Sequence, residues 1–136
     1  MKFNLDQFVR TVVGLKSASY NTGTTNGTGI DRAGYEEALV IVNSGINGTG
    51  GTVAIKVQES DDNSTFADIT GAAFATITEA TDDTVYVGRL NLQSRKRYLR
   101  VVATVATAAC HFGVNVLLSG AKSLPVQQVN AVSFSV

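Results

Sequence analysis

The chain has 136 residues, and its eleven Lys and Arg balance eleven Asp and Glu, so the formal charge is zero. A neutral chain has no generic attraction to a phosphate backbone or an anionic lipid surface, and we expect neither nucleic acid nor a membrane as partner. The lone Cys110 and the lone His111 exclude a disulfide framework and a Cys/His metal cluster.

Val, Ile and Thr together exceed a quarter of the residues, alongside 13 Gly and one Pro. β-branched residues favour strands, and glycine favours turns. Asn4 and Asp6 interrupt the first residues, which therefore lack the continuous apolar core of a secretory signal. We expect a single domain over residues 1–136 that is made in a cytoplasm.

The first third of the chain is ambiguous at its start. Residues 3–16 carry apolar side chains at a spacing that suits either an amphipathic helix or a strand, and the pattern does not separate them. Residues 20–29 have no apolar side chain after Tyr20, so we interpret them as a long exposed loop whose glycines supply flexibility. Residues 38–42 are then predicted to form a buried strand.

Regular alternation follows. Residues 52–60 alternate between apolar and polar side chains and, with residues 66–69, predict a hairpin over 52–70. We interpret residues 72–90 as a second hairpin, and residues 98–106 and 110–118 as two further strands. These short strands, with no helical segment between them, predict an all-β fold, a single antiparallel β-sandwich of the jelly-roll kind with a core over 35–120.

Both ends of the chain are expected to act as arms. We interpret residues 1–20 as an N-terminal arm or first strand, and residues 121–136 as a C-terminal arm or edge strand. Apolar residues alternate to the last position, and their exposure would be costly unless the segment adds to a sheet in this molecule or in a neighbour. The candidate interface residues lie in the arms and in a basic cluster: Phe3, Leu5, Phe8, Arg95, Arg97, Arg100, Val132, Phe134 and Val136.

No motif predicts catalysis. Cys110 and His111 are neighbours on a predicted strand, so their side chains point to opposite faces and do not form a nucleophilic pair. Asp61 and Asp62, with Asp68 nearby, are interpreted as turn residues rather than calcium ligands. We expect no enzyme activity, no metal and no cofactor.

Two segments carry a family resemblance. VAIKVQESDDNSTFADITG, beginning at Val53, and LNLQSRKRYLRVVAT, beginning at Leu90, resemble a recurrent pattern in small structural proteins of tailed-phage heads. The resemblance implies a jelly-roll capsid decoration, or cement, protein that binds non-covalently outside the shell. It implies the major capsid protein and a second copy of the chain as partners, as a homodimer or a trimer. It also implies a place on the virion after synthesis in the bacterial host cytoplasm.

The alternative is a carbohydrate- or receptor-binding β-sandwich module of a phage head fibre or tail. Sugar rings stack on exposed aromatic side chains, and the chain has no Trp to offer. The tyrosines available for such stacking are Tyr20, Tyr35, Tyr86 and Tyr98.

Overall fold

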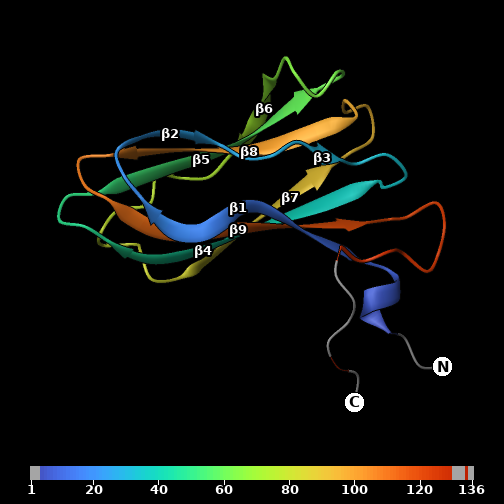
Figure 1. Cartoon of the computed structure of the whole chain (residues 1–136), viewed down its shortest axis with the longest axis horizontal. Helices are drawn as coiled ribbons and strands as arrows, with labels where there is room; N and C mark the ends of the chain where they lie inside the picture. Colours follow the sequence, from blue (N-terminus) through green and yellow to red (C-terminus); the bar gives the residue numbers. More distant parts are fainter. Residues whose placement is uncertain (1–3, 130–133, 135–136) are drawn as a thin grey trace.

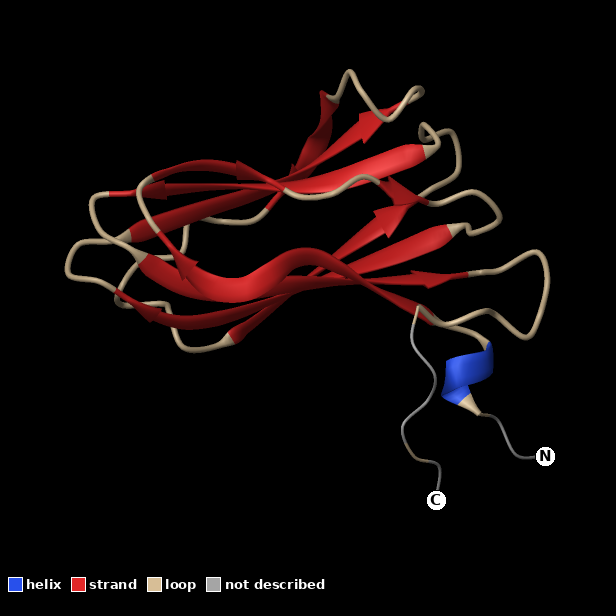
Figure 2. Cartoon of the chain, viewed as in Figure 1, coloured by secondary structure: helices blue, strands red, loops and turns tan. Residues whose placement is uncertain are grey.

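Nine strands account for nearly all regular structure in this computed structural model, which describes residues 4–129 and 134. The 3-10 turn η1 (Leu5–Gln7) precedes them (Figure 2). In the described part of the chain no helix is long and apolar enough to cross a membrane. The strands are β1 (Arg10–Tyr20), β2 (Gly23–Asn26), β3 (Ile30–Asp31), β4 (Glu37–Asn47), β5 (Thr52–Ser60), β6 (Ala67–Ala73), β7 (Val85–Asn91), β8 (Tyr98–Ala106) and β9 (Cys110–Ser119).

The strands form two facing antiparallel sheets (Figure 1). The first sheet has the order β1-β9-β4-β7, and the second has the order β2-β8-β5-β6, with β3 also pairing with β8. If β2 and β3 are taken as one interrupted strand, eight strands wind through both sheets in the order of a jelly roll. The predicted all-β, antiparallel sandwich with jelly-roll topology is confirmed.

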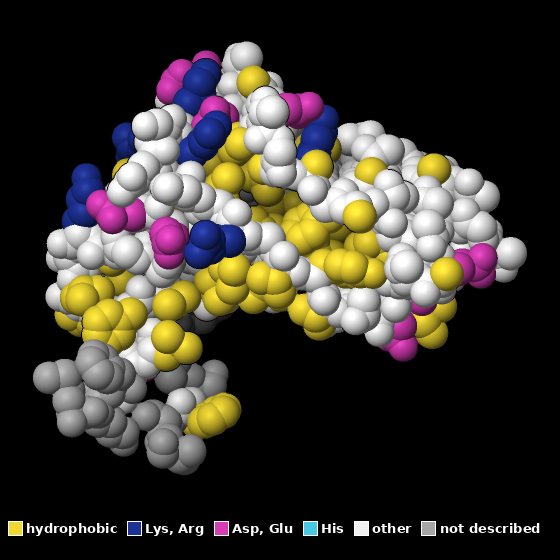
Figure 3. Space-filling model, turned by 180° about the vertical axis from the view of Figure 1, so that it is seen from behind, with side chains coloured by type: hydrophobic (Ala, Val, Ile, Leu, Met, Phe, Trp, Pro, Cys, Tyr) yellow, Lys and Arg dark blue, Asp and Glu magenta, His cyan; other side chains and the backbone are white. Residues whose placement is uncertain are grey.

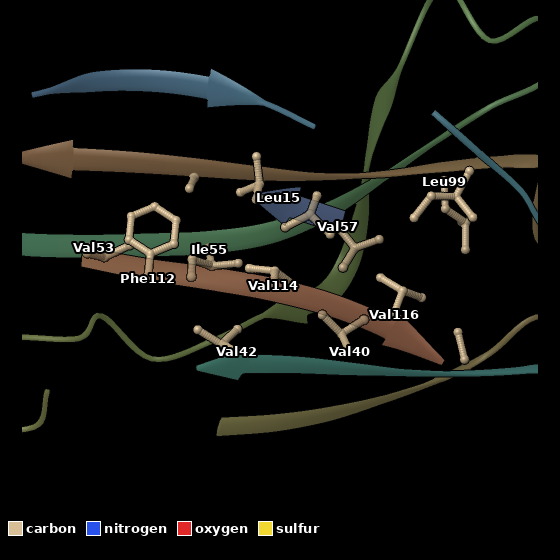
Figure 4. Close-up of a cluster of buried hydrophobic side chains, with 14 of the residues drawn as sticks. Leu15, Val40, Val42, Val53, Ile55, Val57, Leu99, Phe112, Val114 and Val116 are labelled. Atoms are coloured by element: carbon tan, nitrogen blue, oxygen red, sulfur yellow. The ribbon is translucent and has the colours of Figure 1, made fainter. Parts of the chain in front are cut away.

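The core lies between the sheets because alternate side chains of each strand point inward. Val53, Ile55 and Val57 of β5 are buried and face the side chains of β4 and β9 across the sandwich (Figure 4). Phe112 is 2% exposed and stacks on Tyr20, with 4.5 Å between the ring centroids. The sandwich is therefore stabilised by the apolar side chains that both sheets bury between them and by the stacking of Phe112 on Tyr20.

The predicted hairpin over residues 72–90 is wrong. β6 pairs with β5 and β7 pairs with β4, so the chain crosses from one sheet to the other between them. Residues 74–77 still run beside β5, since Phe74 N–H donates to the Ile55 carbonyl and Ile77 bridges to Val53. Their alternation reflects this edge position, and alternation alone does not reveal which strand is the partner.

The predicted loop over residues 20–29 is also wrong, because it contains β2. Thr24 pairs with Thr104 of β8, and their hydroxyl oxygens lie 3.1 Å apart. β-branched threonines suit an exposed strand although they carry no apolar signal. The chain then continues to Gly27, whose N–H donates to the Val101 carbonyl over 2.7 Å.

The structure resolves the ambiguity at the N-terminus in favour of a strand. β1 pairs along β9, with irregularities between Val13 and Leu15 and between Leu15 and Ala18. Residues 121–129 contain no strand, but they contact the start of the chain. Val126 N–H donates to the Gln7 carbonyl, and the side chain of Gln128 donates to the carbonyls of Asp6 and Val9. We call this set of contacts the terminal clamp.

Candidate functional site

Three residues of the basic cluster, Arg95, Lys96 and Arg97, are paired with acidic side chains. Arg97 forms a bidentate contact with Asp31, with nitrogen–oxygen distances of 3.1 and 2.8 Å. The hydrogen bond from Arg97 lowers the pKa of Asp31, and the same contact raises the pKa of Arg97. The pair joins the segment before β8 to β3, so Arg97 has a structural role at this end of the sandwich.

Arg95 and Lys96 turn toward β5. The Glu59 carboxylate accepts from the Lys96 N–H over 2.9 Å and lies 3.5 Å from Arg95, and Lys96 Nζ lies 3.1 Å from Asp61. Arg100 donates to the Gln58 side chain over 2.8 Å, and its guanidinium lies 4.2 Å from the Phe66 ring centroid. Arg95, Lys96 and Arg97 are therefore paired with acidic side chains, whereas Arg100 contacts neutral groups, and the contiguous basic residues in the sequence do not reveal this difference.

The terminal clamp places some of the predicted arm residues. Leu5 is 72% exposed and Phe134 is 79% exposed, while Phe8 is partly buried. Phe3, Val132 and Val136 lie outside the described residues. The exposed apolar side chains Leu124 and Val129 belong to the same segment as the clamp.

The aromatic and acidic candidates lie apart. Tyr20, Tyr35 and Tyr86 pack against the core, and Tyr98 lies beneath Arg97 with its ring centroid 5.3 Å from the guanidinium carbon. This arrangement offers no shared aromatic platform for a sugar. Cys110 is buried, whereas His111 is exposed. Among the described residues, no group of three or more His, Cys, Asp or Glu could hold a metal ion.

Asp62 organises the turn between β5 and β6. One of its carboxylate oxygens accepts hydrogen bonds from the Ser60 hydroxyl and from the N–H groups of Ser64 and Thr65, at 2.8 to 2.9 Å. These bonds, led by the one from Thr65, lower the pKa of Asp62 to about 2. These contacts show that Asp62 is a turn residue, as the sequence predicts.

We expect the contribution of Asp62 to stability to disappear in acid. Its pKa is depressed in the folded state, so the contribution is complete above the unfolded value of about 4 and is lost as the pH falls through about 2. Urea unfolding at pH 5, 3 and 2 should show a gap between wild type and Asp62→Ala that narrows with acidity. Ser64→Ala keeps its N–H donor and should show no such narrowing, and a constant gap for Asp62→Ala would contradict the prediction.

A groove of about 500 Å³ opens where the two sheets separate at one side of the sandwich. Figure 3 shows hydrophobic side chains gathered in a hollow on the face behind that of Figure 1. The groove is lined by residues of β4, β5, β6 and β7 and of the segments after β6 and β7. They include Val40, Val57, Ile69, Phe74, Val87, Arg89, Leu90 and Arg95. Although β6 and β7 follow one another in the chain, they lie in different sheets, and sequence patterns did not predict this groove.

Comparison with known families identifies the chain. A model of the Bbp16 family matches residues 9–116, which run from the start of β1 into β9. The chain belongs to the Bbp16 family. No curated protein sequence matches it.

Solved structures share the fold of this Bbp16-family chain at low identity. The PBSX exported protein XepA aligns with a TM-score of 0.60 and 15% identity, over 100% of this chain and 46% of XepA. The SPBc2 prophage-derived protein YomS aligns with a TM-score of 0.54 and 12% identity, over 81% of this chain and 91% of YomS. A chain of infectious bursal disease virus, Gx strain, aligns with a TM-score of 0.55 and 10% identity, over 86% of this chain and 33% of the viral chain. The Bbp16-family chain therefore spans less than half of XepA, and these likenesses concern the fold alone.

Proposed function

We propose that this Bbp16-family chain is a structural, non-enzymatic protein of a phage virion that binds the outside of the capsid shell non-covalently and stabilises it. The observation that carries the proposal is its jelly-roll sandwich, a fold shared with two proteins of phage-derived elements and with a virus structure. The resemblance of the segments after Val53 and Leu90 to phage-head proteins supports the same function. The partner is the major capsid protein, and the site of action is the virion surface after synthesis in the bacterial host cytoplasm.

We assign the contact with the shell to the end of the sandwich where the terminal clamp lies. Leu5 and Leu124 are 72% and 52% exposed there, next to the clamp that orders residues 126–128 on the chain start. Exposed apolar side chains that are held in place by such contacts are a feature of protein interaction sites. The basic cluster contributes less, because Arg95, Lys96 and Arg97 are already paired with acidic side chains within the chain.

Co-sedimentation with shells that lack the protein tests the proposal. We expect saturable binding and a raised temperature of shell disruption. Leu5→Asp combined with Leu124→Asp should weaken binding at least tenfold, because each buried carboxylate carries a large desolvation cost. Ile46→Asp is the matched control and should leave binding unchanged. Ile46 is 69% exposed and lies next to the last residue of β4, away from the terminal clamp. Absence of binding to shells from the same source would overturn the proposal.

A further inference from the structure

The groove on the open side of the sandwich reaches down to core residues. Val40, Val57 and Ile69 belong to its lining and are only 3 to 5% exposed. Gly88 of β7 lies opposite Val40 on β4, and because it has no side chain it leaves Val40 open to the groove. The groove volume of about 500 Å³ is within the range of roughly 300–1,000 Å³ that is typical of small-molecule sites.

The two ends of the groove differ in character. Arg95 lies at one end, where its guanidinium is 3.5 Å from Glu59 of β5. Phe74 lies toward the other end, since its N–H donates to the carbonyl of Ile55 on the same strand. On β7 the lining runs from Val87 to Asn91, and four steps of about 3.3 Å give a length of about 13 Å. The groove therefore has a charged end and an aromatic end, with aliphatic side chains between them.

The charged residues of the groove are all basic. Among the described residues, the lining includes Arg89 and Arg95 but no Asp or Glu. Arg89 shares the exposed, outward positions of β7 with Val85 and Val87, so its side chain begins on the other face of the strand. Arg95 is therefore the cation that a ligand inside the groove meets, and the charge of the lining favours an anion.

Arg95 is incompletely paired within the chain. Its distance of 3.5 Å to the Glu59 carboxylate is longer than the ~2.7–2.9 Å of a strong charged hydrogen bond. The other oxygen of Glu59 accepts from the Lys96 N–H over 2.9 Å. Among the described residues the Arg95 guanidinium forms no further hydrogen bond, and its side chain is 36% exposed. Most of its N–H donors are thus available to an anion in the groove.

These features define the ligand. A carboxylate matches the planar guanidinium of Arg95, which can donate two parallel hydrogen bonds to it. The rest of the ligand lies against apolar side chains such as Ile69, Phe74 and Leu90, where a polar group without a partner is costly. A ligand that fits therefore has one anionic head and an unbroken hydrocarbon tail.

We propose that the groove binds a free, unbranched aliphatic carboxylate of about the length of decanoate, with its carboxylate on Arg95 and its chain against Ile69, Phe74 and Leu90. The bound chain covers the apolar side chains that the two sheets leave accessible between β6 and β7. Because the ligand binds the folded chain, it also stabilises the fold. Binding needs no capsid shell, so this inference goes beyond the proposed function.

Titration of the full chain with decanoate, below its micelle-forming concentration, tests the site. Isothermal titration calorimetry should show one site per chain, and the thermal midpoint should rise with the decanoate concentration. Removing methylenes from the chain, as in octanoate, should weaken binding by up to about fourfold for each one. An affinity that does not depend on chain length would contradict burial of the tail.

The charge of the head group is tested with decyltrimethylammonium, which carries the same chain on a cation. We expect it to bind at least about tenfold more weakly than decanoate, because a hydrogen bond to a charged group contributes about that factor and the cation cannot form it. Equal binding of the two probes would show that the groove takes any hydrocarbon chain, and it would overturn the assignment to a carboxylate.

Substitution of Arg95 tests the position of the head group. Arg95→Gln should weaken decanoate binding at least about tenfold, since the charged hydrogen bonds are lost. Lys96→Gln is the matched control, because Lys96 is the next basic residue but pairs with Asp61 and is absent from the lining. Unchanged binding in Arg95→Gln, or an equal loss in Lys96→Gln, overturns the proposal.

Filling the groove provides a second readout. Ala72 is partly buried in the lining, so Ala72→Phe should occupy the space of the tail and abolish decanoate binding. Ala54→Phe is the control, since Ala54 is exposed on β5 and outside the lining. Circular dichroism shows whether each variant keeps the β-sandwich, and Arg95→Gln remains decisive if Ala72→Phe misfolds. Absence of saturable binding to the folded wild type overturns the proposal and leaves the proposed function, which is measured by shell co-sedimentation, intact.

Discussion

Replacing Phe112 with alanine should destabilise the protein by about 3–5 kcal/mol, the usual cost of removing a buried phenylalanine side chain. Phe112 is 2% exposed, and its ring stacks on Tyr20 across the β1–β9 pair at 4.5 Å and an angle of 23°. The substitution removes this stacking and leaves a cavity between the sheets. Thermal unfolding should show a midpoint roughly 10 to 20 °C lower than that of wild type.

Phe112→Leu separates loss of volume from loss of the ring. Leucine refills much of the site, so we expect a cost of about 1–1.5 kcal/mol, which is typical of hydrophobic exchanges that nearly conserve volume. Equal midpoints for Phe112→Ala and wild type would show that the sheets close over the cavity without penalty, contrary to the prediction.

The second large effect is expected at Gly27. A β-carbon at this position would lie 2.3 Å from the Gly14 carbonyl oxygen and 2.9 Å from the Val101 carbonyl oxygen. Both atoms belong to the backbone of strands, β1 and β8, and the Val101 carbonyl oxygen accepts the hydrogen bond from Gly27 N–H, so moving it aside would break that bond. Gly27→Ala should therefore cost at least about 2–3 kcal/mol, as overpacking of a rigid site does. Urea unfolding should show a lower midpoint with an unchanged slope.

Gly88→Ala is the matched control for this substitution. Its β-carbon would meet the tip of the Phe74 ring at 3.0 Å, and a flexible side chain can turn away. We expect a cost of less than about 1 kcal/mol. If Gly88→Ala lowered the free energy of unfolding as much as Gly27→Ala, the close approach of the backbone at Gly27 would not explain the effect. Any added methyl group at a glycine of the sandwich would then be equally destabilising.

Gly27 and Gly88 differ in what surrounds them, and the sequence does not show this difference. The interpretation of Gly27 as a flexible loop residue is wrong, because the chain needs glycine there to approach Gly14. That approach joins β1 to the segment after β2, and a contact between two separate strands leaves no local pattern. The alternating residues of β5 and β9, by contrast, predicted their strands correctly. A strand with one buried face carries apolar residues at alternate positions, and this pattern is visible in the sequence.

The candidate surfaces divide in the same way. The basic residues around Arg97 are adjacent in the sequence, so the sequence predicts the cluster. Their partner Asp31 lies 66 positions from Arg97, and no local pattern predicts that pair. The groove between β6 and β7 depends on the order of strands in both sheets, which periodicity does not specify. The apolar alternation of the last residues, by contrast, is a local pattern that the sequence shows directly.

The terminal clamp also makes the chain suitable for circular permutation. Val126 N–H lies 3.0 Å from the Gln7 carbonyl oxygen, so the two ends of the folded chain meet on one side of the sandwich. A short linker from Val129 to Asn4 would join them with little loop-closure entropy. New ends could then be opened in the exposed turn around Thr81, giving a circularly permuted chain that keeps all nine strands and presents fused cargo at the far end of the domain.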